Sequence, residues 1–149
     1  MVLTQGSRSR MSEGARMLPD PGRGLPAKRL APIPGMDAAM RRCIDLCRKC
    51  EAICIEAARH CLARGGRYAE PDFVNLLLAC AESCRTSERF MLLRSEFHLT
   101  VCGINADVCE AAADDCEAMG TDEVLKRCVE ACRRCAASCR EMAGRPVSA

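Results

Sequence analysis

The residues of this chain best suited to chemistry are cysteines at helical spacing. Two runs share the same steps of four, three and four residues: Cys43, Cys47, Cys50 and Cys54, then Cys128, Cys132, Cys135 and Cys139. Such steps return to one face of an α-helix. Each run therefore predicts a helix that presents a column of four thiols. Thiolates are soft metal ligands, so the pattern indicates binding of a soft metal.

Cysteine is abundant along the rest of the chain as well. The total is fourteen, and the other six are Cys61, Cys80, Cys84, Cys102, Cys109 and Cys116. No apolar stretch typical of a secretory signal opens the sequence, so a cytoplasmic location is expected. That compartment keeps thiols reduced. Many cysteines in such a setting indicate metal or redox chemistry and not a disulfide framework.

Helix start and stop signals divide the chain into four long helical segments. They run from an Asp37 cap to about 64, from 71 to about 93, from a Ser95 cap to about 119, and from 121 to about 143. Short connections between long helices are typical of an antiparallel, up-down-up-down four-helix bundle. The predicted fold is all-α. Its expected parts are a disordered basic leader at 1–35, the cysteine-lined bundle at 36–144 and a short tail at 145–149.

In heptad register all fourteen cysteines fall on the inward stripes of these helices, together with Asn105, which we expect to pack or line the interior. Antiparallel topology then separates two ends. Soft or borderline ligands gather at one end: Met36, Met40, Met91, His98 and Met142. Apolar residues gather at the other: Phe73, Leu77, Met119 and Leu125. The bundle is predicted to have a methionine and histidine mouth and an apolar plug.

The spacing bears on which metal these thiols hold. A zinc or iron–sulfur site needs four ligands that converge on one centre, usually with CxxC in a loop. Here i,i+4 pairs such as Cys50/Cys54 repeat along the axis, within reach of a shared two-coordinate ion. Soft sulfur ligands favour Cu(I). One monovalent ion per thiolate also keeps a buried core near neutral, which gives a capacity on the order of a dozen ions.

Other classes are less consistent with the sequence. The paired Glu and Glu-x-x-His motifs of a diiron enzyme are not on the inner faces, and we expect no catalytic activity. The net charge is only +2 and no run of about 18 apolar residues occurs, so neither a nucleic-acid nor a membrane partner is expected. An iron–sulfur or zinc-binding thiol protein, with a redox or metal-buffering role, remains the alternative to copper storage.

Over residues 36–144 the chain resembles the cysteine-rich four-helix-bundle copper storage proteins of bacteria, in particular their cytosolic branch. The CxxxCxxCxxxC runs at 43–54 and 128–139, the pair Cys80/Cys84 and the series Cys102, Cys109, Cys116 carry the resemblance. It implies a homotetramer that stores many Cu(I) ions on the fourteen cysteines, with Met40, Met91 and His98 at the mouth. Ala57, Phe73, Leu77 and Ala112 depart from the thiol lining, which thins toward the plugged end.

Overall fold

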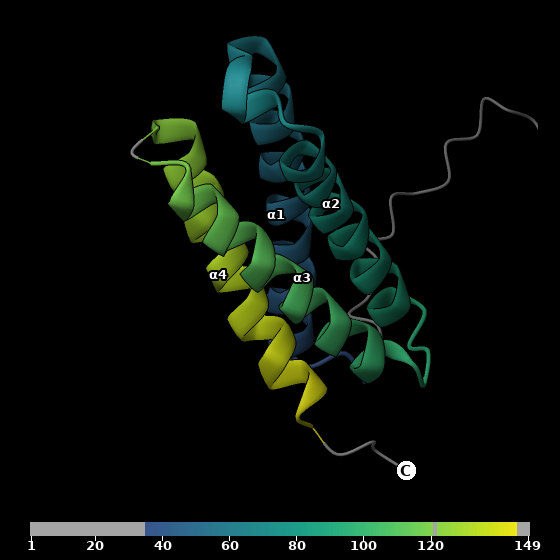
Figure 1. Ribbon diagram of the computed structural model, residues 1–149. Coiled ribbons are helices and arrows are strands. Elements are labelled where there is room, and N and C mark those ends of the chain that lie inside the picture. Colours follow the sequence, from purple (N-terminus) through teal and green to yellow (C-terminus); the bar gives the residue numbers. More distant parts are fainter. Residues whose placement is uncertain (1–34, 121, 146–149) are drawn as a thin grey trace, which may run out of the picture. The chain divides into compact units, whose positions relative to one another are not determined.

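Four long helices make up almost all of the structure, a computed structural model that describes residues 35–120 and 122–145 (Figure 1). They are α1 (Ala38–Arg64), α2 (Pro71–Leu92), α3 (His98–Ala118) and α4 (Glu123–Ala143). A single 3-10 turn, η1 (Gly66–Ala69), lies between α1 and α2. The described residues contain no strand. Of the predicted leader and tail, all but Gly35 and Arg145 lie outside the described residues.

Each helix packs against two neighbours, so the four form a closed ring around one interior. α1 contacts α2 and α4, and α3 contacts the same two helices. Consecutive helices run in opposite directions, and the short connections alternate between the two ends of the bundle (Figure 1). The predicted all-α, up-down-up-down antiparallel bundle is confirmed. No helix in the described part of the chain combines the length and the hydrophobicity needed to cross a membrane.

The limits of α1 follow from the residues beside it. The carboxylate of Asp37 accepts a hydrogen bond from the backbone N–H of Met40 at 2.8 Å and satisfies one of the unpaired donors of the first turn. Gly65 then ends the helix with a φ of 70°, in the left-handed region that favours glycine. Both limits agree with the sequence prediction. The 27 residues between them carry five of the cysteines.

The predicted start of the third helix is three residues too early, and the backbone N–H of Ser95 belongs to the end of α2. That N–H donates to the carbonyl of Phe90 at 3.1 Å, and the N–H of Arg94 donates to that of Met91 at 3.0 Å. With Arg94 at a φ of 51°, this pair of bonds forms a Schellman motif. The side chain of Ser95 does face the next helix, since its Oγ accepts the N–H of Phe97 at 3.3 Å, but α3 itself begins three residues later at His98, with Phe97 in the cap position.

Asp122 is the cap that begins α4, and the predicted start at Thr121 lies outside the described residues. The Oδ1 atom of Asp122 accepts the N–H groups of Val124 and Leu125 at 2.9 and 3.2 Å. Its Oδ2 lies 2.9 Å from His60 Nε2 and 2.5 Å from Arg64 Nη1, so the same side chain joins α4 to the last turn of α1. Burial of Asp122 opposes ionisation, but hydrogen bonds from His60, the Leu125 N–H and Arg64 lower its pKa to about 2.

Charged side chains cover the outside of the bundle and leave the interior to small residues. Arg133 pairs with Asp114 and Glu117, and Arg140 pairs with Asp107 and Glu110, which links α4 to α3. Exposed pairs of this kind contribute little free energy individually. Their main consequence is that the helix faces rich in arginine and carboxylate point outward, which leaves the cysteine faces of all four helices directed inward.

The Asp122 junction yields a stability prediction. Replacing Asp122 by alanine is expected to lower the free energy of unfolding of the reduced protein by about 1–2 kcal/mol at pH 7, because both the helix cap and the link to α1 are lost. Asp122→Asn, which retains a capping oxygen but not the charge, should lose less. Urea unfolding followed by circular dichroism measures both differences.

The pH dependence of that difference provides the internal control. The carboxylate contribution is complete above the ordinary pKa of 3.8 and is lost as the pH falls toward 2, where folded Asp122 takes up its proton. The gap between the wild type and Asp122→Ala should therefore narrow below about pH 4. Equal unfolding midpoints at pH 7 would show that the junction does not hold the two helices.

Candidate metal-binding core

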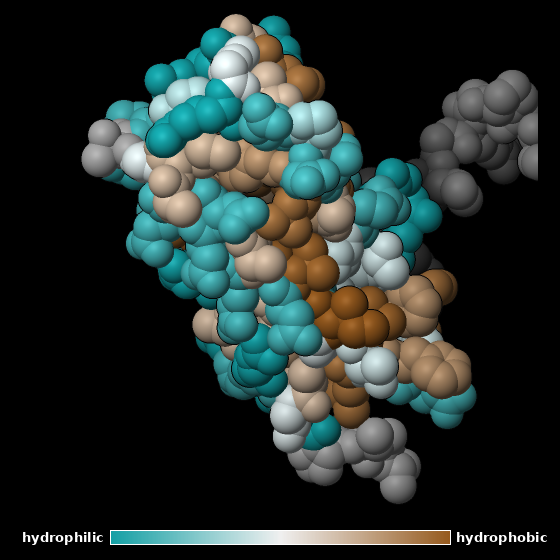
Figure 2. Space-filling model, viewed as in Figure 1, coloured by the Kyte–Doolittle hydropathy of each residue, from teal (hydrophilic) through white to brown (hydrophobic). Residues whose placement is uncertain are grey.

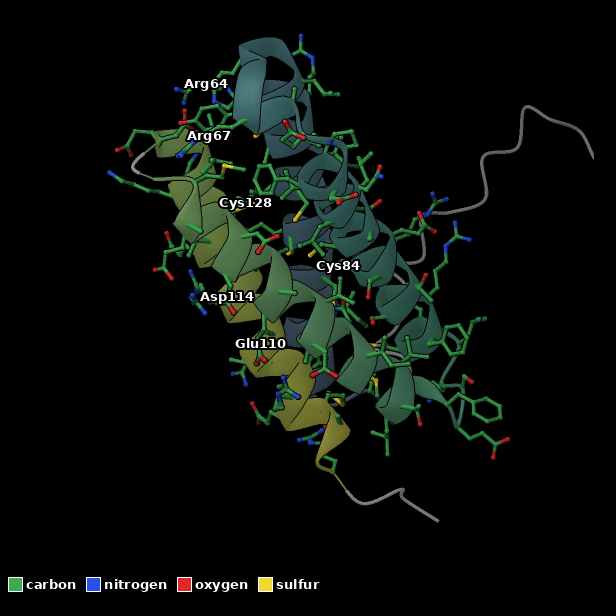
Figure 3. All side chains as sticks on the ribbon, in the orientation of Figure 1. Arg64, Arg67, Cys84, Glu110, Asp114 and Cys128 are labelled. Carbon is green, nitrogen blue, oxygen red and sulfur yellow. The ribbon has the colours of Figure 1, made fainter. Side chains whose placement is uncertain are left out.

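Sulfur fills the interior of the bundle. All fourteen cysteines are free thiols, and each has a fully buried side chain. In Figure 3 the labelled Cys84 and Cys128 lie between the helices, whereas Glu110 and Asp114 project from the outer surface of α3. The inward placement of every predicted cysteine is thereby confirmed. Large apolar side chains are few in this core, so the thiols themselves occupy the space that leucine or isoleucine would normally fill.

The sulfur atoms contact one another mainly across helices. Cys43 of α1 lies 3.5 Å from Cys139 of α4, and Cys80 of α2 lies 3.6 Å from Cys109 of α3. Contacts within one helix are among the longest. Cys50 and Cys54 are 3.9 Å apart, as are Cys128 and Cys132. The i,i+4 pairing that the sequence predicted is therefore present at these two pairs, and the thiols of each stripe also meet those of the neighbouring helices.

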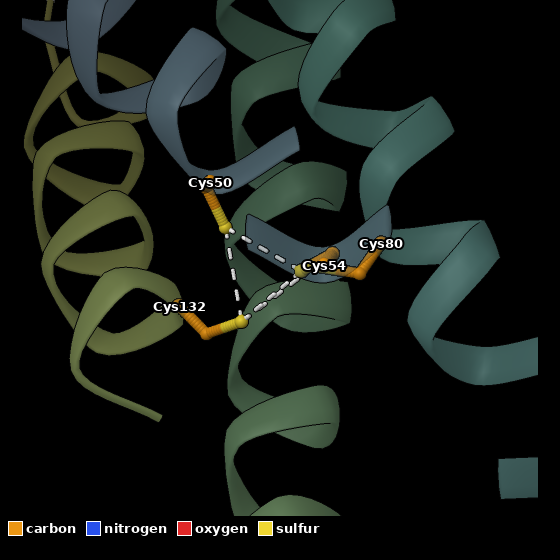
Figure 4. Close-up of side chains that lie close together, drawn as sticks. All are labelled: Cys50, Cys54, Cys80 and Cys132. Carbon is orange, nitrogen blue, oxygen red and sulfur yellow. Dashed lines mark hydrogen bonds between the residues drawn. The ribbon is translucent and has the colours of Figure 1, made fainter. Parts of the chain in front are cut away.

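Four groups of cysteines bring their sulfur atoms within 4.8 Å of one another. Figure 4 shows the first, in which α1 supplies Cys50 and Cys54, α2 supplies Cys80 and α4 supplies Cys132. The others are Cys50–Cys84–Cys109–Cys135, Cys43–Cys102–Cys139 and Cys47–Cys135–Cys139. Because Cys50, Cys135 and Cys139 each belong to two groups, the groups form a continuous chain of sites along the bundle.

The three cysteines outside these groups lie toward the plugged end. Cys128 still contacts Cys54 at 3.8 Å, while Cys61 has no thiol that close among the described residues. Burial raises the pKa of the Cys61 thiol above its ordinary value. A hydrogen bond with Cys128, and then burial, raise the pKa of Cys116. The expectation that the thiol lining thins toward this end agrees with the geometry.

Neighbouring thiols also oppose the ionisation of the cluster as a whole. A hydrogen bond from Cys109 lowers the pKa of Cys135, and the same interaction raises the pKa of Cys109. Once one thiolate has formed, its neighbours thus hold their protons more tightly. Buried charges need compensation, so the core becomes anionic only as far as bound cations neutralise it.

The sulfur spacing suits trigonal coordination of a metal ion. A metal–sulfur bond of roughly 2.3 Å places the three sulfurs of a trigonal site about 4.0 Å apart, and those of a tetrahedral site about 3.8 Å apart. The observed contacts of Cys50 with Cys132 and Cys54 are 3.7 and 3.9 Å. Distance alone thus fits zinc as well as copper. Shared cysteines favour a monovalent ion, because bridging thiolates then approach one negative charge per ion.

A pocket of about 470 Å³ opens at the end where α1 and α3 begin. Its lining includes Met40, His98 and Met142, three of the residues predicted for the mouth. The ring of His98 is fixed by a 2.7 Å hydrogen bond from Nδ1 to the carbonyl of Ser95. Because Nδ1 donates to this carbonyl, Nε2 is the ring nitrogen left to accept a metal ion. The first thiol group lies one helical turn further in and consists of Cys43, Cys102 and Cys139.

The other two residues predicted for this end, Met36 and Met91, do not line the pocket. Met36 is half-buried. The side chain of Met91 is fully buried among the core residues. The opposite end is closed as predicted, since Phe73, Leu77 and Leu125 are all buried there. Met119 is only half-buried, and its carbonyl accepts a hydrogen bond from Arg67. The two ends of the bundle therefore differ in chemistry: one is open and carries soft ligands, the other is apolar and tied by the Asp122 junction.

Asn105 has a closer relation to the thiols than the sequence indicated. Its amide nitrogen lies 3.3 Å from Cys139 Sγ and 3.7 Å from the sulfurs of Cys47 and Cys135. Its position on the inward stripe of α3 was the signal available in the sequence. The sequence could not show which cysteines it would meet, because all three belong to α1 and α4.

A ring of four helices around connected groups of buried thiols defines a metal-binding helical bundle protein. A family model described as copper storage protein matches residues 36–144, and the chain belongs to that family. Copper is accordingly the metal that this family stores, and the connected thiol groups supply soft ligands suited to it.

Solved structures agree with this assignment. The Nmul_A1745 protein from Nitrosospira multiformis is 42% identical over 70% of this chain and 94% of its own, with a TM-score of 0.66. The Cu(I)-bound copper storage protein BsCsp3 is 28% identical over 71% and 99% of the two chains, with a TM-score of 0.67. Apo-Csp3 from Bacillus subtilis is 29% identical over 70% of this chain and 98% of its own, with a TM-score of 0.64. No curated protein sequence matches the chain.

Cu(I) loading is expected to release protons. Burial holds thiols such as Cys61 in the protonated form, so each thiol must lose its proton before it binds a metal as a thiolate. Release of about one proton per ion would make the affinity fall by about tenfold for each pH unit of acidification. A dye-based proton count during anaerobic titration of weakly buffered protein measures this release. Loading without proton release would show that the thiols are already ionised in the metal-free core.

Proposed function

We propose that this chain is a non-catalytic Cu(I) store in the cytoplasm, with its cysteines as the ligands. The proposed metal ligands are Cys43, Cys47, Cys50, Cys54, Cys61, Cys80, Cys84, Cys102, Cys109, Cys116, Cys128, Cys132, Cys135 and Cys139. The observation that carries the proposal is the sharing of Cys50, Cys135 and Cys139 between neighbouring thiol groups. A chain of shared sites suits many ions, whereas one catalytic or redox centre would need a single isolated group.

We place copper uptake at the 470 Å³ pocket. His98 and Met40 line it and would take the ion first, since imidazole and thioether bind Cu(I) without losing a proton at neutral pH. Met91 would act one step further in, because it is buried within the core. The ion would then pass to Cys43, Cys102 and Cys139 and move along the shared thiols by ligand exchange.

The assembly proposed for this chain is a homotetramer without nucleic-acid or membrane partners. Exposed apolar side chains support association between copies. Ile104 of α3 is 57% exposed and Leu78 of α2 is 45% exposed. Figure 2 shows apolar surface over the side of the bundle formed by α2 and α3, next to a strongly hydrophilic area over α3 and α4. Light scattering of the full chain tests the tetramer.

The central prediction concerns capacity. Titrated anaerobically with Cu(I) against a chromogenic Cu(I) chelator, the reduced protein should withhold on the order of a dozen ions per chain before the chelator takes up copper, because each buried thiolate needs about one monovalent charge. Withholding only one or two ions would contradict storage.

The iron–sulfur and zinc alternatives can be tested on the same protein preparation. Visible absorption with bound iron and sulfide in the isolated protein would support a cluster. Displacement of Cu(I) by an equal concentration of Zn(II) would support a zinc buffer.

The uptake route makes its own prediction. A variant with Met40→Leu, Met91→Leu and His98→Gln should load Cu(I) several-fold more slowly than the wild type, while its capacity stays nearly the same, because the thiols are intact. Stopped-flow transfer from a weak chelator measures the rate.

A matched control variant uses the same kinds of residue at the closed end, Met119→Leu with His60→Gln. It should load at the wild-type rate. Equal slowing in both variants, or none in the first, would contradict uptake through the pocket.

A further inference from the structure

Asn105 is an unusual residue to find inside a thiol core. Its side chain is fully buried, and only Ser87 and Ser138 are also polar and buried among the described residues. Ser87 donates its hydroxyl to the carbonyl of Val101 and so serves the backbone. The amide of Asn105, by contrast, has cysteines as its hydrogen-bond partners on both its oxygen and its nitrogen.

The contacts of this amide coincide with one thiol group. Its nitrogen lies within 3.7 Å of Cys47, Cys135 and Cys139, which together are one of the four groups that could hold a metal. The oxygen accepts a hydrogen bond from the thiol of Cys109 at 3.6 Å. This bond turns the NH₂ end toward the three sulfurs. The group at Cys50, Cys54, Cys80 and Cys132 has no such donor.

Burying an amide costs free energy unless it is well hydrogen-bonded, and thiols are weak acceptors. In the metal-free core Asn105 therefore has poor partners. Thiolates bound to copper are better partners, because hydrogen bonds to charged acceptors are stronger and the sulfur then only accepts. One Cu(I) on three thiolates leaves excess negative charge, which the N–H groups partly offset. Donors already directed at these sulfurs favour the copper-bound state of this group.

We infer that Asn105 is a positioning residue that makes Cys47, Cys135 and Cys139 the first site to fill when copper enters an empty core. The inference rests on the storage function proposed above. The site lies close to the mouth, since Cys139 also belongs to the outermost group with Cys43 and Cys102. An ion held there leaves the deeper groups free, and later ions can bind through the shared Cys135 to the group at Cys50, Cys84 and Cys109.

The sequence makes a direct test possible, because side-chain amides are rare in this chain. They belong to Gln5, Asn75 and Asn105 alone. Asn75 is exposed on α2 and provides an internal reference. In ¹⁵N-labelled reduced protein, the NH₂ signals of Asn105 should be replaced by a shifted pair during the first equivalent of Cu(I), while those of Asn75 stay unchanged. The signals that vanish in Asn105→Leu give the assignment.

Two variants measure the effect on affinity. Asn105→Leu should bind the first Cu(I) at least tenfold more weakly in competition with a chelator, with the total capacity of the wild type. Ser87→Ala removes another buried polar group, one that contacts no thiol. It should change neither the affinity for the first Cu(I) nor the total capacity. If Asn105→Leu folds poorly, the NMR titration of the wild-type protein still tests whether copper reaches the Asn105 site first.

Asn105 signals that shift only after several equivalents would overturn the inference, as would wild-type affinity for the first ion in Asn105→Leu. A wild-type capacity of one or two ions would instead contradict the storage function itself. The two failures are therefore distinguishable.

Discussion

The charge balance of buried sulfur is the constraint on which the rest of this structure depends. Fourteen thiols share one interior from which water is excluded, and a thiolate in such a place needs a positive charge beside it. The four helices supply no lysine or arginine to the interior, since their charged residues lie on the outer faces. Among the described residues the core holds no positive charge of its own, so bound metal must supply it. The neutral thiols that remain pack as small apolar groups when copper is absent.

Because the core consists largely of thiols, contacts elsewhere in the chain must help to stabilise the fold. Thiols bury less apolar area than leucine or isoleucine, so packing contributes less to stability than in an ordinary bundle. The ends of the helices compensate with specific contacts. Asp37 caps α1, a Schellman motif ends α2 and Asp122 links α4 to α1. Fixed ends keep the four cysteine stripes in register without a large apolar core.

Much of the fold could be predicted from the sequence, because helix caps, stop signals and the three-and-four spacing of cysteine are local properties. The inward position of all fourteen thiols follows from them. The start of α3 was placed three residues too early, because Ser95 accepts an N–H of the connection through its side chain and also ends α2 through its backbone, and the sequence does not show where the turn between them stops.

The cross-helix sulfur contacts and the partners of Asn105 could not be predicted. They depend on the relative rotation and height of neighbouring helices, which a single sequence does not specify. A contact such as Cys43 with Cys139 joins residues 96 positions apart.

The most direct test of the account is X-ray absorption at the copper edge of the fully loaded protein. Thiolates shared between neighbouring ions predict a first shell of two to three sulfurs at roughly 2.3 Å, together with a second shell of nearby copper atoms. A first shell dominated by nitrogen or oxygen, or sulfur-bound copper without copper neighbours, would contradict a continuous chain of shared sites along the bundle.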